Sequence, residues 1–231
     1  MYHKALDIYE RNGDELGAAR TFRNLGSIAT DREDFEAAEE WVWKSIHSNE
    51  KQGNEIGASQ SYNQLGMISY WRGDLDAADK WYRKSLEIDE RSGDEHGAAK
   101  TYHNLSAVAN KREDFKSAEQ WLWKSLHIKE KQGDRIGIAR SYHQLGIVAE
   151  TRQDLDAAEQ WIFKSLEIYD ELNAEIDVAN CYEHLGSLAS KRNDFEASKK
   201  WYEKALEIYE KRGLIDWATK LRTAIAEKSS V

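Results

Sequence analysis

Three histidines and one cysteine are the residues of this chain whose spacing first suggests chemistry. His103 and His143 stand 40 residues apart, and His184 lies one residue beyond the next such place. A zinc site needs about three ligands converging at near 2 Å, whereas packed helices stand about 10 Å apart, so we expect no metal. Cys181 stands where the matching segments carry Thr or Ser. We expect it to be a structural thiol rather than a nucleophile.

Sequence motifs with a known catalytic mechanism do not occur in the chain. There is no Gly-x-Gly-x-x-Gly, Walker lysine loop, His-Glu-x-x-His or Gly-x-Ser-x-Gly. The carboxylates are abundant, 42 Asp and Glu in 231 residues, which is typical of the solvated face of charged helices. We therefore predict a protein that is not an enzyme and that needs no cofactor.

The charge and the apolar pattern exclude further classes of partner. With 33 Lys and Arg against 42 Asp and Glu, the net charge is -9, which is the wrong sign for neutralising phosphates, so we expect no nucleic acid. No apolar stretch approaches the roughly 18 residues of a membrane span, and the first residues lack a signal-peptide pattern. The single cysteine favours a reducing compartment. We therefore expect a cytoplasmic protein that does not bind membranes.

The elements that position any site are predicted to be helices. They belong to one 40-residue unit that is repeated five times along the chain. The chain has no proline, where average usage of about 5% predicts roughly 11 or 12, and proline is the residue that breaks helices. Tryptophans recur at Trp41, Trp81, Trp121, Trp161 and Trp201. Full units run 13–52, 53–92, 93–132, 133–172 and 173–212, with a partial repeat at 1–12 and a C-terminal capping helix at 213–231.

Each unit predicts two amphipathic helices. In 53–92, apolar or small residues fall on one side of a helix from about Glu55 to Arg72. Gly73 then ends it, and Asp74 stands where an N-cap belongs. A second helix follows to about Arg91. Two helices cannot bury their apolar stripes alone, so the hairpins must stack into an all-α, right-handed solenoid that forms one domain over 1–231.

One motif resembles a known repeat family over essentially the whole chain. The motif reads Tyr62-x-x-Leu65-Gly66, then Gly73-x-Leu75-x-x-Ala78, then Tyr82-x-x-Ser85. It resembles the tetratricopeptide repeat, although the usual proline is absent and the unit is six residues longer than the common 34. The long unit is similar to kinesin light chain, Pins-type adaptors and the repeat arms of bacterial signalling ATPases. The resemblance implies binding of peptides or other proteins.

In the family that this chain resembles, the first helices line a concave groove, so their remaining polar stripe is the predicted binding site. Through the first four units the stripe carries five Lys or Arg against Asp31 and Glu150, a local excess that favours an acidic or carboxylate-bearing peptide. The candidate residues are Arg20, Arg23, Asn24, Asn63, Gln64, Met67, Tyr70, Trp71, Lys100, His103, Asn104, Lys111, Arg140, His143 and Gln144.

Three kinds of role are expected within this stripe. Basic and imidazole groups would supply charge-assisted bonds, namely Arg23, Lys100, Arg140, His103 and His143. Amides would hold the peptide backbone, because an amide offers a donor and an acceptor together. Met67, Tyr70 and Trp71 would form one apolar pocket for an anchoring side chain. The alternative is that these polar residues are only solvated.

A second surface and two further functions stay open. Trp43, Trp123 and Phe163 project away from the Trp41 series, either lying flat over their own helices or forming a convex contact surface. Besides a peptide-binding scaffold, the chain could be a sensor or regulatory arm of a larger signalling protein. It could also be a self-assembling array, since the segment Tyr2–Glu10 matches Tyr202–Glu210 and resembles an unpaired second helix.

Overall fold

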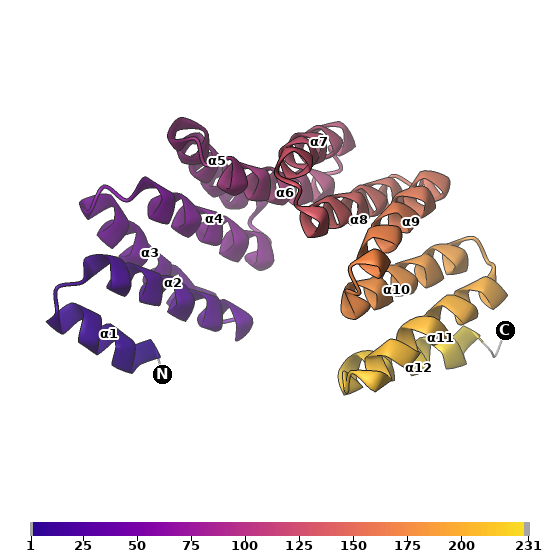
Figure 1. Ribbon diagram of the computed structural model, residues 1–231. Helices are drawn as coiled ribbons and strands as arrows, with labels where there is room; N and C mark the ends of the chain where they lie inside the picture. Colours follow the sequence, from indigo (N-terminus) through magenta and orange to yellow (C-terminus); the bar gives the residue numbers. More distant parts are fainter. Residues whose placement is uncertain (1, 229–231) are drawn as a thin grey trace. The chain divides into compact units, whose positions relative to one another are not determined.

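The computed structural model describes residues 2–228, and the architecture of that range is entirely helical. The predicted all-α class of stacked helix–turn–helix hairpins is confirmed (Figure 1). Met1 and residues 229–231, which the predicted partial repeat and capping helix include, lie outside the described residues. The described helices are α1 Tyr2–Arg11, α2 Glu15–Asp31, α3 Phe35–Lys51, α4 Glu55–Arg72, α5 Leu75–Ser92, α6 Glu95–Lys111, α7 Phe115–Gln132, α8 Arg135–Thr151, α9 Leu155–Glu171, α10 Glu175–Lys191, α11 Phe195–Lys211 and α12 Ile215–Lys228.

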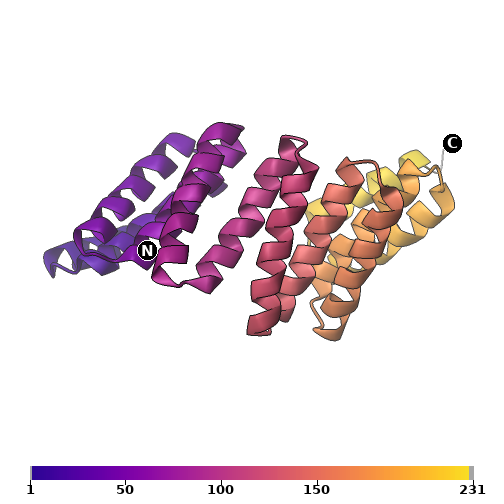
Figure 2. The same cartoon turned by 90° about the horizontal axis from the view of Figure 1, so that it is seen from above.

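The helices group into two compact units, Met1–Ile128 and Lys129–Val231. Within unit 1, α2 packs on α3 and α4 packs on α5 as antiparallel hairpins, and α3 also packs on α4. Unit 2 repeats this plan with α8 on α9 and α10 on α11. Figure 2 shows the helices of each unit lying side by side. The division into five 40-residue repeats within one domain stays a prediction.

The turns between helices follow the capping chemistry that the sequence predicts. Gly73 ends α4 with a φ of 88°, a left-handed conformation that costs a glycine little. Asp74 then accepts a hydrogen bond at 2.9 Å from the backbone N–H of Ala77 and so caps α5. The same cap begins α6, where Asp94 accepts from Gly97 at 2.9 Å. These short turns hold each pair of helices antiparallel.

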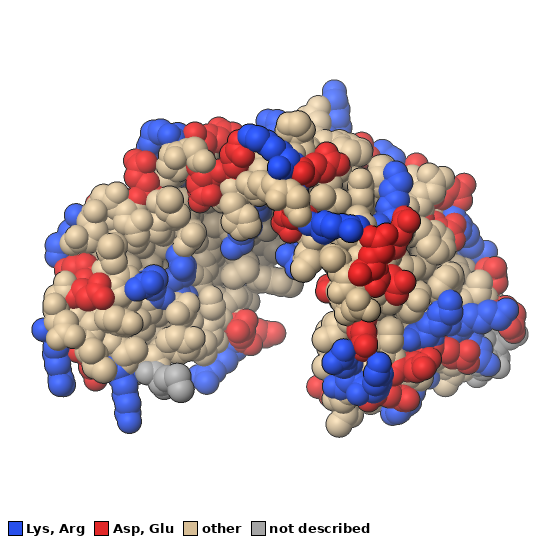
Figure 3. All heavy atoms as spheres, viewed as in Figure 1, with Lys and Arg blue, Asp and Glu red and all other residues tan. Residues whose placement is uncertain are grey.

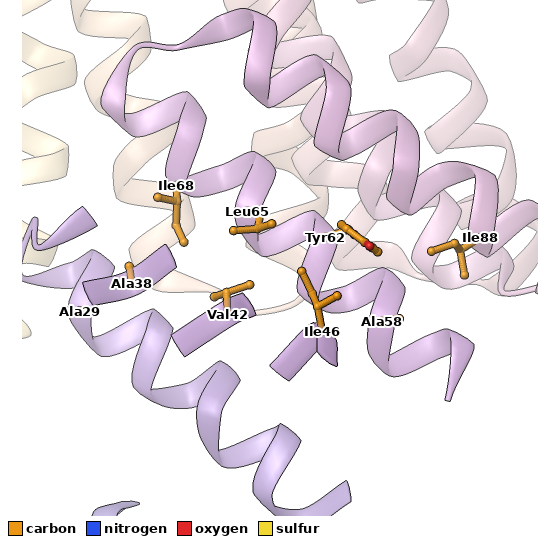
Figure 4. Packing of buried hydrophobic residues seen from close by; sticks show 9 residues of the cluster. All are labelled: Ala29, Ala38, Val42, Ile46, Ala58, Tyr62, Leu65, Ile68 and Ile88. Carbon is orange, nitrogen blue, oxygen red and sulfur yellow. The ribbon is translucent and has the colours of Figure 1, made fainter. Parts of the chain in front are cut away.

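The core of unit 1 lies between successive helices. In Figure 4, Val42 and Ile46 of α3 face Leu65 and Ile68 of α4. All four side chains are at most 2% exposed. Burial of one such side chain contributes about 1.5–3 kcal/mol. Stacking of the hairpins therefore supplies the apolar burial that one hairpin lacks.

A repeated serine adds a polar tie between the two helices of a hairpin. Ser45 donates from α3 to the backbone carbonyl of Ala19 in α2 at 2.8 Å. In unit 2, Ser165 of α9 donates to the carbonyl of Ala139 in α8, also at 2.8 Å. Both hydroxyls are fully buried, and a satisfied buried bond fixes the register of the two helices.

The glycine of the Leu-Gly motif is required by close packing. A Cβ built on Gly66 would lie 2.5 Å from Cδ1 of Tyr82, a buried ring of the partner helix α5. At the equivalent positions one repeat later the chain has Ser106 and Leu122. A side chain larger than hydrogen is thus tolerated where the facing residue is not tyrosine.

We expect Gly66→Ser to lower the free energy of unfolding by about 2–3 kcal/mol, because the Tyr82 ring must shift within a packed core. Urea denaturation followed by circular dichroism measures the change. The double variant Gly66→Ser/Tyr82→Leu copies the pair found one repeat later and should recover part of the loss. A single variant as stable as the parent would contradict this account of the glycine.

No helix in the described range is both long and apolar enough to cross a bilayer.

Candidate functional site

In unit 1 the first helices of three successive repeats, α2, α4 and α6, line a cavity of about 340 Å³, called here the α2–α4–α6 cavity. It collects most of the predicted stripe of unit 1, together with residues at the start of α6. Its lining residues are Arg23, Ser27, Gln60, Asn63, Gln64, Met67, Asp94, His96, Gly97 and Lys100. Most of the lining residues have polar or charged side chains, so its ligand chemistry includes hydrogen bonding and charge.

Two cations from different helices converge on this cavity. Burial lowers the pKa of Arg23 on α2, and the neighbouring Arg20 lowers it further. Burial also lowers the pKa of Lys100 on α6, followed by repulsion from Arg23. Like charges held together in a desolvated place are unfavourable unless an anion joins them. Arg23 also donates a hydrogen bond to Gln60, so its remaining donors and the Lys100 ammonium are the groups that an anion would contact.

A buried carboxylate, Asp89, also acts on Lys100. Asp89 of α5 is 1% exposed and receives hydrogen bonds from Ser59 and, at 3.3 Å, from Thr101. Burial raises the pKa of Asp89, and these hydroxyls counteract the rise. Asp89 in turn raises the pKa of Lys100. Among the lining side chains Arg23 and Lys100 exceed the one carboxylate, Asp94, by a single charge, and the buried Asp89 offsets this excess.

The amides of the stripe divide into two kinds. Asn63 donates to Thr101 at 2.9 Å and accepts from Asn104 at 3.1 Å, so these amides join α4 to α6. Gln64 donates to the carbonyl of Arg23 and to Ser27, both at 3.1 Å. Its Oε1 atom, in a side chain 6% exposed, is buried without a hydrogen-bond partner. Gln64 therefore retains an acceptor for a ligand N–H.

The remaining stripe residues of unit 1 lie around this cavity rather than in it. Arg20 and Asn24 are exposed on α2. Met67 lines the cavity, but Tyr70 and Trp71 do not. Instead, the Tyr70 and Trp71 rings meet edge to face at 5.7 Å, and the Lys111 ammonium lies 4.9 Å from the Tyr70 ring. A pocket shared by Met67, Tyr70 and Trp71 therefore stays a prediction.

The stripe residues of unit 2 form a different environment. The imidazoles of His143 on α8 and His184 on α10 stack with ring centroids 4.6 Å apart. Burial lowers the pKa of His143 to about 3, and the neighbouring His184 adds to this. With this pKa His143 is neutral at pH 7, which argues against the predicted positive charge of this side chain. Gln144 beside it is partly buried, and Arg140 is exposed near the hydroxyl of Tyr169.

His103 lies on α6 of unit 1, at the repeat position that matches His143. Its side chain is partly buried and interacts with neighbouring residues.

The aromatic residues of the predicted convex surface, Trp43, Trp123 and Phe163, are 41–47% exposed. Two of them pack on the following hairpin. Trp43 meets Trp81 edge to face at 5.4 Å, and Phe163 meets Trp201 at 5.9 Å. Trp43 and Phe163 therefore bridge neighbouring second helices rather than lying flat over their own. Trp123 is similarly exposed.

Sequence reasoning missed Asp89, Asp94 and His96 as parts of this site. Position 89 carries an available signal, because its repeat partners include Asn49 and Lys129, which are polar and also buried. A hydrophilic residue recurring on a buried helix face indicates a polar network inside the repeat. Figure 3 shows both acidic and basic side chains on this face of each unit, so the net charge of the chain does not indicate the charge of one cavity.

Comparison with known proteins identifies the class. The family model described as tetratricopeptide repeat matches residues 57–131 and 137–211. The chain belongs to the tetratricopeptide repeat family. No curated protein sequence matches the chain.

Solved structures support the same fold at low identity. BtubC from P. vanneervenii has a TM-score of 0.79 at 18% identity, with 92% of this chain and 89% of that chain covered. A Rap protein complexed with competence and sporulation factor has a TM-score of 0.80 at 15% identity, covering 94% and 61%. A signal transduction ATPase with a tetratricopeptide repeat sensor from Pyrococcus horikoshii gives 0.78 at 18%, covering 95% and 33%.

Proposed function

We propose that this tetratricopeptide repeat scaffold binds a peptide that carries acidic side chains or a free C-terminal carboxylate, with the α2–α4–α6 cavity as the primary site. The observation that carries the proposal is the convergence of Arg23 and Lys100, two cations whose pKa values are both lowered. A ligand carboxylate between them would relieve their repulsion and form charge-assisted bonds.

The open acceptor of Gln64 supports a peptide rather than a simple anion. Gln64 lines the same cavity as the two cations, and its Oε1 is buried without a hydrogen-bond partner. A peptide offers a backbone N–H to this oxygen and a carboxylate to Arg23 and Lys100, which a small inorganic anion cannot do together. Two neighbours point the same way, since one Rap structure is complexed with competence and sporulation factor and another with the Phr* peptide.

We also propose that the protein is not an enzyme and that it acts in the cytoplasm. Within unit 2, Arg140, Gln144 and His143 would offer polar contacts of their own.

The test compares two double variants that remove the same charge. From a set of acidic peptides with free C-termini, the tightest binder is chosen by fluorescence anisotropy. We expect Arg23→Gln/Lys100→Gln to weaken that binder at least thirtyfold, because loss of a desolvated charge partner costs about 2–5 kcal/mol. The control Arg11→Gln/Lys116→Gln removes two exposed cations outside the cavity and should change affinity by less than about threefold.

Amidation of the peptide and replacement of its Glu by Gln should reproduce the loss in the parent protein. If no peptide of the set binds, or if the cavity variant binds as tightly as the parent, the α2–α4–α6 cavity is not the peptide site.

A second candidate function is that of a sensor arm in a larger signalling protein. It is favoured by the likeness to the Pyrococcus horikoshii ATPase, of which this chain covers 33%. Peptide binding in the same cavity would then be the signal that the arm detects. Self-assembly, the third alternative, predicts a mass above the monomer in light scattering at high concentration.

A further inference from the structure

Unit 1 contains a second cavity, on the other side of the first hairpin from the peptide site. It lies between the turn that joins α1 to α2 and the middle of α3, has a volume of about 590 Å³, and is called here the α1–α3 cavity. The corresponding place one repeat later encloses only about 230 Å³. Glu10 and Ser48 line the first cavity, and Glu50 and Ile88 occupy the same positions in the second. Serine in place of isoleucine accounts for part of the additional space.

In the next two repeats the glutamate of this position accepts a hydrogen bond from a tyrosine of the chain. Tyr62 donates its hydroxyl to Glu50 at 2.8 Å, over a spacing of twelve residues. One repeat later, Tyr102 donates to Glu90 at 2.6 Å. These bonds contribute, after burial, to raising the pKa of both tyrosines to about 12. The recurrent bond shows that the carboxylate position is aimed at the tip of the ring.

At the position of Tyr62 the first repeat has Phe22, which keeps the aromatic ring but lacks the hydroxyl donor. Phe22 stacks on Trp41 at 5.9 Å and 18°, and Tyr62 stacks on Trp81 at 5.8 Å and 18°. Because the stacking geometry is the same, the tip of the Phe22 ring occupies the place of the tyrosine tip. Phenylalanine carries no hydroxyl there, so Glu10 does not receive the bond that its repeat partners receive.

The end of the chain shows which other group satisfies this carboxylate. Arg222 stands at the tyrosine position of its repeat, and its guanidinium donates to Glu210 at 2.5 Å. The spacing is again twelve residues. A guanidinium therefore replaces the tyrosine hydroxyl at this site in the protein's own architecture, and the same geometry is open to an external guanidinium at Glu10.

Charge and aromatic surface in the α1–α3 cavity fit the same ligand. Glu10, Asp14 and Glu15 line it together with the Lys44 ammonium. Asp14 caps α2 by accepting from Gly17, and Glu15 pairs with Lys51 at 2.7 Å, so Glu10 is the carboxylate left for a ligand. The Lys44 ammonium is held 4.3 Å from the Trp41 ring. Exposed π-surface is available on Trp43, which is 44% exposed. Carboxylate and indole together are the groups that bind a guanidinium by hydrogen bonds and by cation–π attraction.

We propose that the α1–α3 cavity binds an arginine side chain of a partner protein, with Glu10 accepting from the guanidinium and Trp43 lying beside it. The cavity is separate from the α2–α4–α6 cavity. A partner could thus present an acidic peptide to one cavity and a basic side chain to the other.

The test uses N-acetyl-L-arginine amide as the probe and N-acetyl-L-citrulline amide as its uncharged isostere. The indole N–H resonance of Trp43, assigned by its loss in Trp43→Phe, reports binding in NMR titrations. We expect saturable shifts with the arginine probe at a dissociation constant on the order of millimolar, and at least tenfold weaker binding of the citrulline probe.

The chain itself supplies the matched variants. Phe22→Tyr/Ser48→Ile installs the residues that the following repeat carries, so it should fold at least as well as the parent while losing arginine binding at least tenfold. Glu10→Gln should lose it similarly. Arg23→Gln/Lys100→Gln, which alters the peptide site, should bind the probe unchanged.

Three results would overturn the proposal. The first is no saturable shift, or equal shifts with the citrulline probe. The second is parental affinity in Phe22→Tyr/Ser48→Ile. The third is loss of arginine binding in Arg23→Gln/Lys100→Gln, which would place the probe in the α2–α4–α6 cavity.

Discussion

Replacement of Lys129 by methionine is expected to raise the free energy of unfolding by about 2–3 kcal/mol at pH 7. Lys129 is 7% exposed, and its ammonium group donates to Ser141 at 2.9 Å. Burial lowers the pKa of Lys129 to about 8, with Asp134 opposing and Arg140 assisting the change. A lysine with this pKa costs about 3 kcal/mol to keep charged at pH 7. Methionine has a similar length and no charge, so it keeps the packing and removes the cost.

The same group gives the parent protein a distinctive alkaline profile. The folded state releases the Lys129 proton near pH 8, whereas the unfolded chain releases it near 10.5. Between these values the unfolded state binds more protons, so stability rises with pH, by about 1.4 kcal/mol per pH unit at most. Above about pH 10 the raised pKa values of buried tyrosines act in the opposite direction, since unfolding then releases their protons.

Urea denaturation at pH 7, 8.5 and 9.5 measures both effects. The parent should become more stable along this series, and Lys129→Met should not. Lys116→Met, an exposed lysine of the same charge, is the control and should follow the parent. If Lys129→Met is less stable than the parent at pH 7, the ammonium contributes more through Ser141 than its burial costs.

The period of the sequence predicts most of the fold for a physical reason. Two helices of 17 or 18 residues with one apolar face each can bury that face only against another copy of themselves. Turn chemistry is equally local, so Gly73 and Asp74 identify a helix end and a helix start without any tertiary information. Family membership follows from these same residues.

The site is less predictable because its properties depend on neighbours that the helical period does not place. The stripe predicts that Arg23, Asn63 and Lys100 share a surface. It does not predict that the Asn63 amide donates to Thr101, or that Arg23 lowers the pKa of Lys100. Those outcomes depend on the register between α2, α4 and α6, which is set by core packing rather than by the polar residues.

Departures from the repeat are more informative than the repeat itself. Phe22 and Ser48 are unremarkable as single residues, and they acquire meaning only beside Tyr62 and Ile88 in the next unit. Lys129 is similar, since an inward helix position that carries a lysine in one repeat and Tyr169 in the next indicates a local electrostatic cost. An alignment of the five units, in which each residue that departs from the repeat is examined for the interaction it lacks, would therefore identify the α1–α3 cavity and the buried Lys129 from sequence.

The imidazole pair of unit 2 is expected to make the protein sensitive to acid. Burial lowers the pKa of His143 to about 3, and that of His184 is lowered as well, chiefly by burial. Glu150 and Glu183 act against this lowering at His184, and Lys191 acts with it. The stacked rings, 4.6 Å apart, cannot both be charged without repulsion in a desolvated place.

The sign of the effect follows from the two states of His143. The unfolded chain takes up a proton near pH 6.5, and the folded chain does so only near pH 3. As pH falls below 6.5 the unfolded state binds more protons, so stability is lost at up to about 1.4 kcal/mol per pH unit. At pH 5 the loss from His143 amounts to about 2 kcal/mol.

His143→Asn removes this proton uptake and installs the residue that the chain carries at the matching position, Asn63. Urea denaturation at pH 7, 6 and 5 should show a shallower loss for His143→Asn, with a relative gain of about 2 kcal/mol at pH 5. The control His127→Asn removes an exposed imidazole and should follow the parent. Parallel acid profiles of the parent and His143→Asn would mean that the imidazole pair is protonated in the folded state, and His143 would then be available as a cation for an acidic ligand.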